Sequence, residues 1–151
     1  MSNTTDTPND RQAWMSLLAK APEGRAAEHL AGLAPLPTFT WLRAPEIGSV
    51  MVRGRASGTG APFNLGEMSV TRCSLRLSNG AVGHAYVQGR RKRCAEAAAL
   101  VDALMQTEQA DTVRAQVLEP LRSAHVSAKD ARAAKAAATK VDFFTLARGE
   151  D

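Results

Sequence analysis

The spacing of apolar residues near the amino terminus predicts two short helices. Trp14, Leu17 and Leu18 recur at helical spacing within a segment expected to be helical over residues 10–20. A second helix is expected over residues 22–34, because one proline suits its first turn and another ends the pattern. The buried side of this second helix is expected to consist of Ala26, Ala27, Leu30 and Leu33.

The middle of the chain changes to an alternation of apolar and polar residues, which predicts antiparallel strands. A first strand contains Phe39 and Trp41, and residues 44–46 are interpreted as a turn. A second strand is expected over residues 50–53. Residues 54–64, which include glycines and a proline, are then predicted to form a loop.

The pair Asn79-Gly80 predicts a β-hairpin with a two-residue turn, in which both turn residues have positive φ. That register would place three facing pairs on one apolar side of the sheet: Leu77 with Val82, Leu75 with His84, and Cys73 with Tyr86. Helices are expected to cover this side, so His84 is predicted to lie in the core or in an interface. The opposite side would carry Arg72, Ser74 and Arg76.

Helical spacing returns after Gly89. One helix is predicted over residues 91–107, and a shorter one, capped by Asp111, is expected to stop near Pro120. Ser127 and Asp130 form a capping pattern for an Ala-rich helix that ends at Thr139, and residues 141–146 resemble a final short strand. The predicted fold is therefore α+β: a small antiparallel sheet with a central Asn-Gly hairpin, flanked by amino-terminal and carboxy-terminal helices and a final short strand.

The size of the chain indicates one domain. Its 151 residues suit a single α+β domain over residues 10–151, and residues 1–9, rich in Ser, Thr, Asn, Asp and Pro, are expected to be disordered. Aromatic residues make up only 5% of the chain, and much of its 44% hydrophobic content is alanine. Because alanine buries little area, the core is expected to be thin and to gain stability from a partner.

Positive charge is concentrated in the middle of the chain. Residues 48–95 contain eight Lys or Arg and one acid, a net charge of +7, which leaves −3 for the remainder of a chain whose total is +4. This distribution favours an anionic ligand, an acidic partner surface or nucleic acid. A solvated surface explains most of these charges about equally well.

Two segments are candidates for anion binding. The glycine loop around Gly58 and Gly60 could offer backbone N–H groups to a phosphate, although a tight connecting loop is the simpler interpretation, since no Gly-Lys-Ser/Thr follows. The basic run Arg90–Arg93 lies where a helix should start. Cations are disfavoured there by the helix dipole, so their position favours contact with an anion or a partner over a solvated turn.

The chain lacks a recognisable catalytic or metal-binding pattern. Its histidines are scattered, and Cys73 and Cys94 are too few for a structural zinc site or a disulfide framework. No signal peptide or membrane-spanning run is present, so a cytoplasmic location is expected. Phe143 and Phe144 are adjacent and would point to opposite faces of a strand. Either the chain's own helices or a partner subunit could cover them, and their late position beside a charged tail favours the partner.

Several motifs resemble the PhnG family, a subunit of the bacterial phosphonate carbon–phosphorus (C–P) lyase system. The resemblance runs from about Arg11 to Gly149. It rests on Arg11-Gln12-Ala13-Trp14-Met15, Gly58-Thr59-Gly60, Asn64-Leu65-Gly66-Glu67, Thr71-Arg72, Tyr86-Val87-Gln88-Gly89-Arg90 and Asp142-Phe143-Phe144. The basic run Arg90–Arg93 is richer in charge than the family leads one to expect.

The resemblance implies a subunit of the C–P lyase core complex, which acts in organophosphonate catabolism. The implied partners are PhnH, PhnI and PhnJ, with accessory PhnL. The implied reaction joins an alkylphosphonate to the ribose of a nucleoside triphosphate and displaces adenine, which gives a ribose 1-alkylphosphonate 5-triphosphate. Nucleosidase chemistry is associated with PhnI, and radical cleavage with PhnJ and its iron–sulfur cluster. The present chain is therefore expected to be a structural or accessory component of a transferase complex, without a catalytic residue, metal or cofactor of its own.

Under this interpretation the candidate residues make contacts and do not catalyse. Contact with an anion or a partner is expected at six residues: Gly58, Gly60, Arg72, Arg90, Arg91 and Arg93. Phe143 and Phe144 are the interface candidates. Two alternatives remain: a basic nucleic-acid-binding module, disfavoured by the scarcity of aromatic residues, and a stand-alone phosphoryl-handling enzyme that uses Arg90 and its neighbours.

Overall fold

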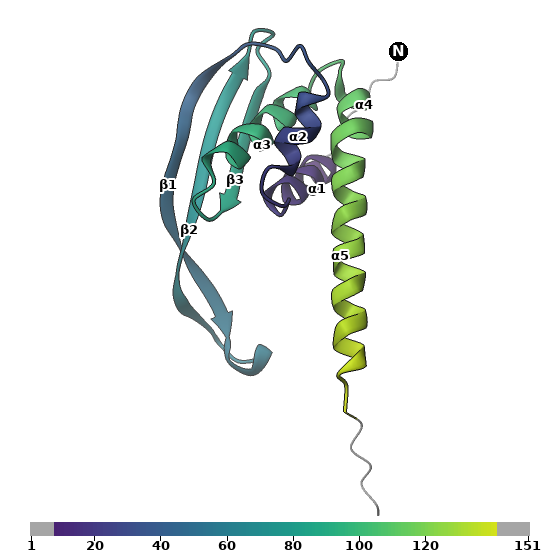
Figure 1. Ribbon diagram of the computed structural model, residues 1–151. Coiled ribbons are helices and arrows are strands. Elements are labelled where there is room, and N and C mark those ends of the chain that lie inside the picture. The colour runs from purple at the N-terminus through teal and green to yellow at the C-terminus, as the bar shows by residue number, and fades with distance from the viewer. Residues whose placement is uncertain (1–7, 142–151) are drawn as a thin grey trace, which may run out of the picture.

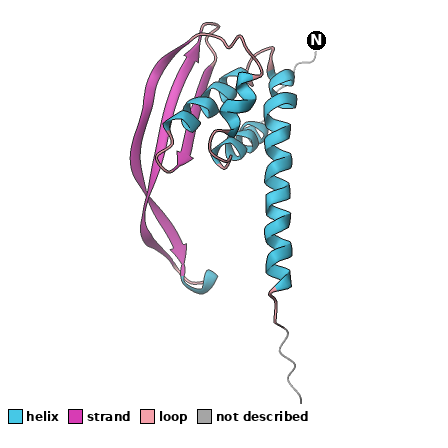
Figure 2. Ribbon diagram, in the orientation of Figure 1, coloured by secondary structure: helices cyan, strands magenta, loops and turns pink. Residues whose placement is uncertain are grey.

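A three-stranded antiparallel sheet and a set of helices on one of its faces make up the fold (Figures 1 and 2). The computed structural model describes residues 8–141. The strands lie in the order β1 (Phe39–Arg55), β2 (Pro62–Leu77), β3 (Val82–Gln88). The fold is therefore α+β, as predicted. The expected final strand lies beyond Val141, outside the described residues, as do Phe143 and Phe144.

The helices fall into two groups. Three of them pack near the sheet: α1 (Pro8–Ala19), α2 (Arg25–Ala31) and α3 (Lys92–Leu104). The second group is one long rod in Figure 1, made of α4 (Ala110–Val113), a π-helical segment (Arg114–Leu118) and α5 (Glu119–Ala138). A single 3₁₀ turn, Ala56–Gly58, lies between β1 and β2.

Helix α3 is the centre of the core. It packs on β3 and β2 with one side and on α1 and α2 with the other, so residues 97–104 are all buried. Half of these side chains are alanine, which lets the neighbouring elements approach closely. The closest approach is at Gly83 of β3, where a Cβ atom would lie 1.9 Å from the carbonyl oxygen of Ala99. Small residues thus let α3 lie close to the sheet, while larger side chains such as Leu75, Val101 and Leu104 fill the rest of the core.

A buried carboxylate ties three elements together. Asp102 of α3 is fully buried and accepts hydrogen bonds from the guanidinium of Arg11, the indole N–H of Trp14 at 2.9 Å and the backbone N–H of His84 at 2.9 Å. Arg11 and Trp14 belong to α1, and His84 belongs to β3. A buried charge is tolerated only when it is paired and hydrogen-bonded, and Asp102 meets both conditions.

The hairpin between β2 and β3 differs from its predicted register by one residue. Leu77 N–H donates to the carbonyl oxygen of Ala81, so the loop has three residues, 78–80, and only its last residue, Gly80, has positive φ. Asn79 instead uses its side-chain oxygen to accept the N–H of Ala81.

The slip of one residue turns β3 over relative to the prediction. Gly83, Ala85 and Val87 face the helices and are buried. His84 and Tyr86, which were predicted on the covered side, are exposed on the other side, where His84 Nδ1 lies 2.8 Å from Ser74 Oγ. The prediction that His84 is a core residue is therefore wrong.

Strand β1 is continuous where a turn was predicted at residues 44–46. Pairing with β2 resumes at Glu46 after an irregularity, so the segment is a bulge in one long strand. Pro45 is compatible with this position because β1 is an edge strand. Pairing also extends to Arg55 and Pro62, which shortens the predicted loop of residues 54–64 to residues 56–61.

Two helix boundaries also differ from the prediction. Helix α2 starts at Arg25 because Gly24, at φ 80°, interrupts the helix expected to begin at Pro22. The rod does not stop at Pro120, which lies in the first turn of α5, just after the wider π-helical turn. Ser127 and Asp130 are therefore exposed mid-helix residues and not a cap. The rod stays intact because Val113, Val117 and Leu121 keep one face buried.

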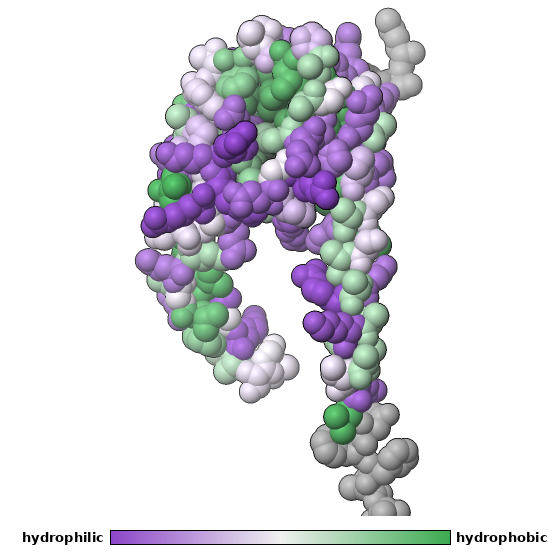
Figure 3. All heavy atoms as spheres, in the orientation of Figure 1, coloured by the Kyte–Doolittle hydropathy of each residue, from purple (hydrophilic) through white to green (hydrophobic). Residues whose placement is uncertain are grey.

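Two arms extend from the body on the same side (Figure 1). One is the ribbon, defined as residues 49–69, where β1 and β2 pair with each other beyond the last contact with β3. The other is the α5 arm, defined as residues 122–138, whose side chains are exposed except for the half-buried His125. Figure 3 shows open space between the lower ends of the two arms.

Candidate functional site

The basic run forms the turn between β3 and α3, and β2 holds this turn in place. The buried hydroxyl of Thr71 donates to the carbonyl oxygen of Gly89 at 2.6 Å and accepts the N–H of Arg91 at 2.9 Å. Gly89, at φ 87°, adopts the left-handed conformation that the turn requires. Thr71 therefore fixes the point at which the chain leaves the sheet and starts α3.

Helix α3 begins here without a side-chain cap. Arg91 occupies the N-cap position but makes no side-chain hydrogen bond to the helix. The first N–H groups of an α-helix have no partner within the helix, and they carry a partial positive charge. The start of α3 is therefore electropositive even before the arginine side chains are considered.

The four basic side chains are not equivalent. Arg91 is half-buried, and its guanidinium donates to the carbonyl oxygens of Gln88 at 3.0 Å and Ala21 at 3.3 Å. Arg90, Lys92 and Arg93 are exposed, and none of them takes part in an ion pair within residues 8–141. Arg91 thus supports the turn, while the other three present their charge to solvent.

A cavity of about 700 Å³ lies beside this turn. All four basic residues line it, and so do Glu23, just before α2, and Glu28 in the first turn of α2. Glu28 is also paired with Arg25 at 3.2 Å. The cavity is therefore of mixed charge with a basic excess, which suits a polyanion that presents several charged groups.

Arg72 lies on the outer face of the sheet and already has an acidic partner. Its Nε atom is 2.6 Å from the carboxylate of Glu46, which also pairs with Arg43 at 2.5 Å. Hydrogen bonds from these two arginines hold the pKa of Glu46 below its ordinary value. Arg72 on β2 thus forms an ion pair with Glu46 at the β1 bulge. It is therefore less available than Arg90 or Arg93 to bind an external anion.

Gly58 and Gly60 form the tip of the ribbon. Gly58 has φ 74°, and a Cβ atom on Gly60 would lie 2.8 Å from the carbonyl oxygen of Ala56, so both glycines are needed for a tight turn. The tip is separated from Thr71 by nine residues of β2, or about 30 Å of extended strand. The structure does not bring these glycines to the basic turn.

The ribbon carries apolar side chains that nothing in the described chain covers. Met51, Phe63 and Leu65 are 53%, 46% and 66% exposed. Figure 3 shows hydrophobic side chains gathered along the lower part of this arm. A two-stranded ribbon is marginally stable in water, and a patch of large apolar side chains marks a site of interaction.

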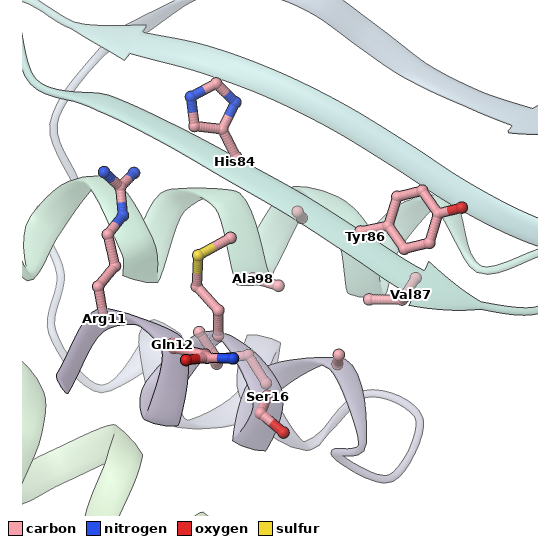
Figure 4. A pocket seen from close by; sticks show the side chains of 11 residues that line it. Arg11, Gln12, Ser16, His84, Tyr86, Val87 and Ala98 are labelled. Carbon is pink, nitrogen blue, oxygen red and sulfur yellow. The ribbon is translucent and has the colours of Figure 1, made fainter. Parts of the chain in front are cut away.

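A second cavity, of about 610 Å³, lies between α1 and the free edge of β3 (Figure 4). Met15 and Ser16 of α1, Ala85 and Val87 of β3, and Ala98 of α3 contribute to its lining. Sequence reasoning missed this cavity, because it depends on the true register of β3. It also missed Asp102, which stands within an apolar stripe and carries no motif of its own.

Residues 8–141 offer few groups for metal binding or for thiol chemistry. No cluster of His, Cys, Asp and Glu in this range could hold a metal ion. Both cysteines are free thiols, and burial raises the pKa of Cys73 to about 12. No helix within the same range is sufficiently long and apolar to span a bilayer.

Comparison with known proteins identifies the family. Residues 9–149 match the family described as phosphonate metabolism protein PhnG. The chain is also similar to the alpha-D-ribose 1-methylphosphonate 5-triphosphate synthase subunit PhnG of Rhizobium meliloti (strain 1021). The two are 44% identical over 142 residues, which cover 93% of this chain and 90% of that protein. This chain belongs to the PhnG family.

Proposed function

We propose that this chain is a subunit of a ribose 1-methylphosphonate 5-triphosphate synthase and works within the C–P lyase core complex in the cytoplasm. The proposal is supported by 44% identity to a subunit of such a synthase over nearly the whole chain. Its partners are PhnH, PhnI and PhnJ, with accessory PhnL. We assign the chain an accessory role within that complex.

The structural observation that carries this proposal is the pair of uncovered arms. The ribbon exposes Met51, Phe63 and Leu65, and the α5 arm is exposed along most of its length. Neither arm adds to the core of the chain, so the natural role of both is to contact other subunits. Gly58 and Gly60 contribute by giving the ribbon its tight tip.

A second contribution comes from the basic turn. The proposed reaction replaces the nucleobase on a ribose with a phosphonate, and the triphosphate stays attached throughout. Both substrates are therefore anions, and the nucleoside triphosphate and the product carry several charges. Arg90 and Arg93 are exposed beside an uncapped helix start, an arrangement that attracts phosphate groups. We assign to this turn an electrostatic contact with the triphosphate or with a carboxylate of a neighbouring subunit.

Co-expression with PhnH, PhnI and PhnJ, followed by affinity purification and native mass spectrometry, tests the proposal. The wild-type chain is expected to co-purify in a defined complex. Leu65→Asp places a charge on the most exposed apolar side chain of the ribbon and should reduce recovery of the complex at least tenfold. Leu36→Asp is the matched control, because Leu36 is 39% exposed but lies outside both arms.

The outcomes separate the two parts of the proposal. A wild-type chain that ignores all three partners would contradict the assignment as a subunit. A Leu65→Asp chain that co-purifies as well as the Leu36→Asp control would contradict the role of the ribbon.

A further inference from the structure

Side chains hydrogen-bond to the free edge of β3 at both of its ends, but its middle is left open. Two backbone hydrogen bonds mark the ends of the β2–β3 ladder. The N–H of Leu77 donates to the carbonyl oxygen of Ala81, and the N–H of Gly89 donates to the carbonyl oxygen of Ser69. Between them, alternate residues of β3 bond to β2. Val82, His84, Tyr86 and Gln88 therefore direct their backbone N–H and C=O groups away from β2, toward α1.

Both ends of this edge are capped by side chains. At one end, Arg11 and Gln106 donate to the carbonyl oxygen of Val82, and Asp102 accepts the N–H of His84. At the other end, Arg91 donates to the carbonyl oxygen of Gln88. Capping of this kind prevents an edge strand from pairing with another chain.

Four groups between the caps remain open. They are the C=O of His84, the N–H and C=O of Tyr86, and the N–H of Gln88, none of which has a partner among residues 8–141. Their spacing matches one antiparallel strand of five residues centred opposite Tyr86. Side chains thus block the two ends of the edge, and the open segment between them can pair with one short added strand.

The cavity of about 610 Å³ lies directly below this open segment. In Figure 4, α1 runs beneath β3, and the labelled side chains of Gln12 and Ser16 stand on the α1 side of the gap. Residues of an added strand that flank its central residue would share the face of Ala85 and Val87, and they would point into the cavity. The site therefore requires two apolar side chains separated by one residue.

We propose that the groove between α1 and the β3 edge binds residues 143–147 of a second copy of this chain as a fourth strand. In this segment Phe144 and Leu146 have the required spacing, and Thr145 would lie opposite Tyr86. The segment has the β-forming composition that strand addition uses. The exchange is reciprocal in a two-fold dimer, because each copy contributes one tail and one groove.

The length of α5 determines that the tail comes from another copy. Leu121 is the last buried residue of the rod, and 17 further residues lead to Ala138 at the end of α5, which carries the chain about 26 Å from the body at 1.5 Å per residue. An extended return over that distance needs about eight residues at 3.3 Å each. Phe144 lies only six residues beyond Ala138, a reach of about 20 Å in extended chain, so it falls short of the groove of its own chain.

The test uses the chain of residues 1–151 alone, so its result is independent of the assignment as a synthase subunit. Native mass spectrometry and light scattering at micromolar concentration should show a dimer. Tyr86→Pro removes the open N–H without touching the ladder to β2, and Phe144→Asp places a charge in the groove. Each variant should weaken dimerisation at least tenfold. Tyr86→Phe and Thr145→Val, which preserve backbone and groove contacts, should dimerise like the wild type.

A mixing experiment identifies the exchange itself. Tyr86→Pro has an intact tail, and Phe144→Asp has an intact groove, so an equimolar mixture should form a heterodimer although neither variant forms a homodimer. A synthetic peptide of residues 141–149 should dissociate the wild-type dimer. A wild-type chain that is monomeric at these concentrations, or a dimer that Tyr86→Pro and Phe144→Asp leave intact, would overturn the proposal.

Discussion

The indole N–H of Trp14 donates a hydrogen bond to the buried carboxylate of Asp102 across 2.9 Å. The guanidinium of Arg11 reaches the same carboxylate at 2.8 Å. These two residues come from the amino-terminal signature that resembles the PhnG family, and the structure gives this signature a physical role. It locks α1 to α3 and, through the N–H of His84, to the edge of β3.

Asp102→Ala is expected to destabilise the chain by about 3 kcal/mol, because it leaves the buried indole N–H of Trp14 and the part-buried N–H of His84 without an acceptor. Denaturant unfolding followed by circular dichroism measures the effect. Asp130→Ala, an exposed acid in the middle of α5, is the control and should stay within about 0.5 kcal/mol of wild type. Equal midpoints for the two variants would refute the role given to Asp102.

Gly83→Ala should be one of the most damaging single-methyl changes in this chain. The new Cβ atom would lie 1.9 Å from the carbonyl oxygen of Ala99, so α3 must move away from β3. We expect a loss of about 3 kcal/mol or more, or failure to fold. Gly48→Ala is the matched control in a strand, because nothing lies within 4 Å of its Cβ position. A thermal melt in which both variants unfold together would contradict the close approach.

Arg90→Ala combined with Arg93→Ala should leave assembly intact and raise the KM of the synthase for its nucleoside triphosphate about tenfold. The reason is that both side chains are exposed and hold no ion pair in the described part of the chain. Arg76→Ala, an exposed arginine on the outer face of the sheet, is the control for loss of charge. Loss of the complex in the double variant would instead assign these arginines to a subunit interface.

The two cysteines should differ sharply in reactivity. Cys73 is 2% exposed, and burial raises its pKa to about 12, so its thiol stays protonated at neutral pH. Cys94 is only half-buried. A thiol reagent at pH 8 should therefore label one cysteine in the native chain and both after unfolding, and Cys94→Ser should abolish the native reaction. Fast native labelling of the Cys94→Ser chain would contradict the burial of Cys73.

The same pKa gives a direction to the alkaline stability. Because burial raises the pKa of Cys73 above its ordinary value of 9.0, the folded state disfavours the thiolate. Its contribution to stability is complete below about pH 9 and is lost as the pH rises toward 12. The midpoint of denaturant unfolding should fall over this range, and less so in a Cys73→Ala chain.

Local pattern predicted the elements of this fold better than their register. Apolar spacing found α1 and α3, and alternation found the strands, because each pattern reflects burial of one face. The predicted hairpin register was wrong by one residue, since the hydrogen bond from the N–H of Ala81 to the side-chain oxygen of Asn79 favours a three-residue loop over the two-residue turn. That single slip moved His84 and Tyr86 to the exposed face and concealed the groove along β3.

Other features depend on contacts that no local pattern contains. Pro120 predicts a helix end, yet the buried face formed by Val113, Val117 and Leu121 carries the rod past it. The candidate anion-binding residues were predicted together, but Gly58 and Gly60 lie at the ribbon tip, away from Arg90 and Arg93 at the start of α3. The length and direction of β1 and β2, which the sequence pattern does not give, place the two groups of residues apart.

The most direct test of the central claim is to reconstitute the synthase reaction with and without this chain. Nucleoside triphosphate and methylphosphonate would be supplied to the PhnH, PhnI and PhnL proteins, and the products followed by ³¹P NMR. We predict that ribose 1-methylphosphonate 5-triphosphate accumulates only when this chain is present. Formation of the same product at the same rate in its absence would contradict the account.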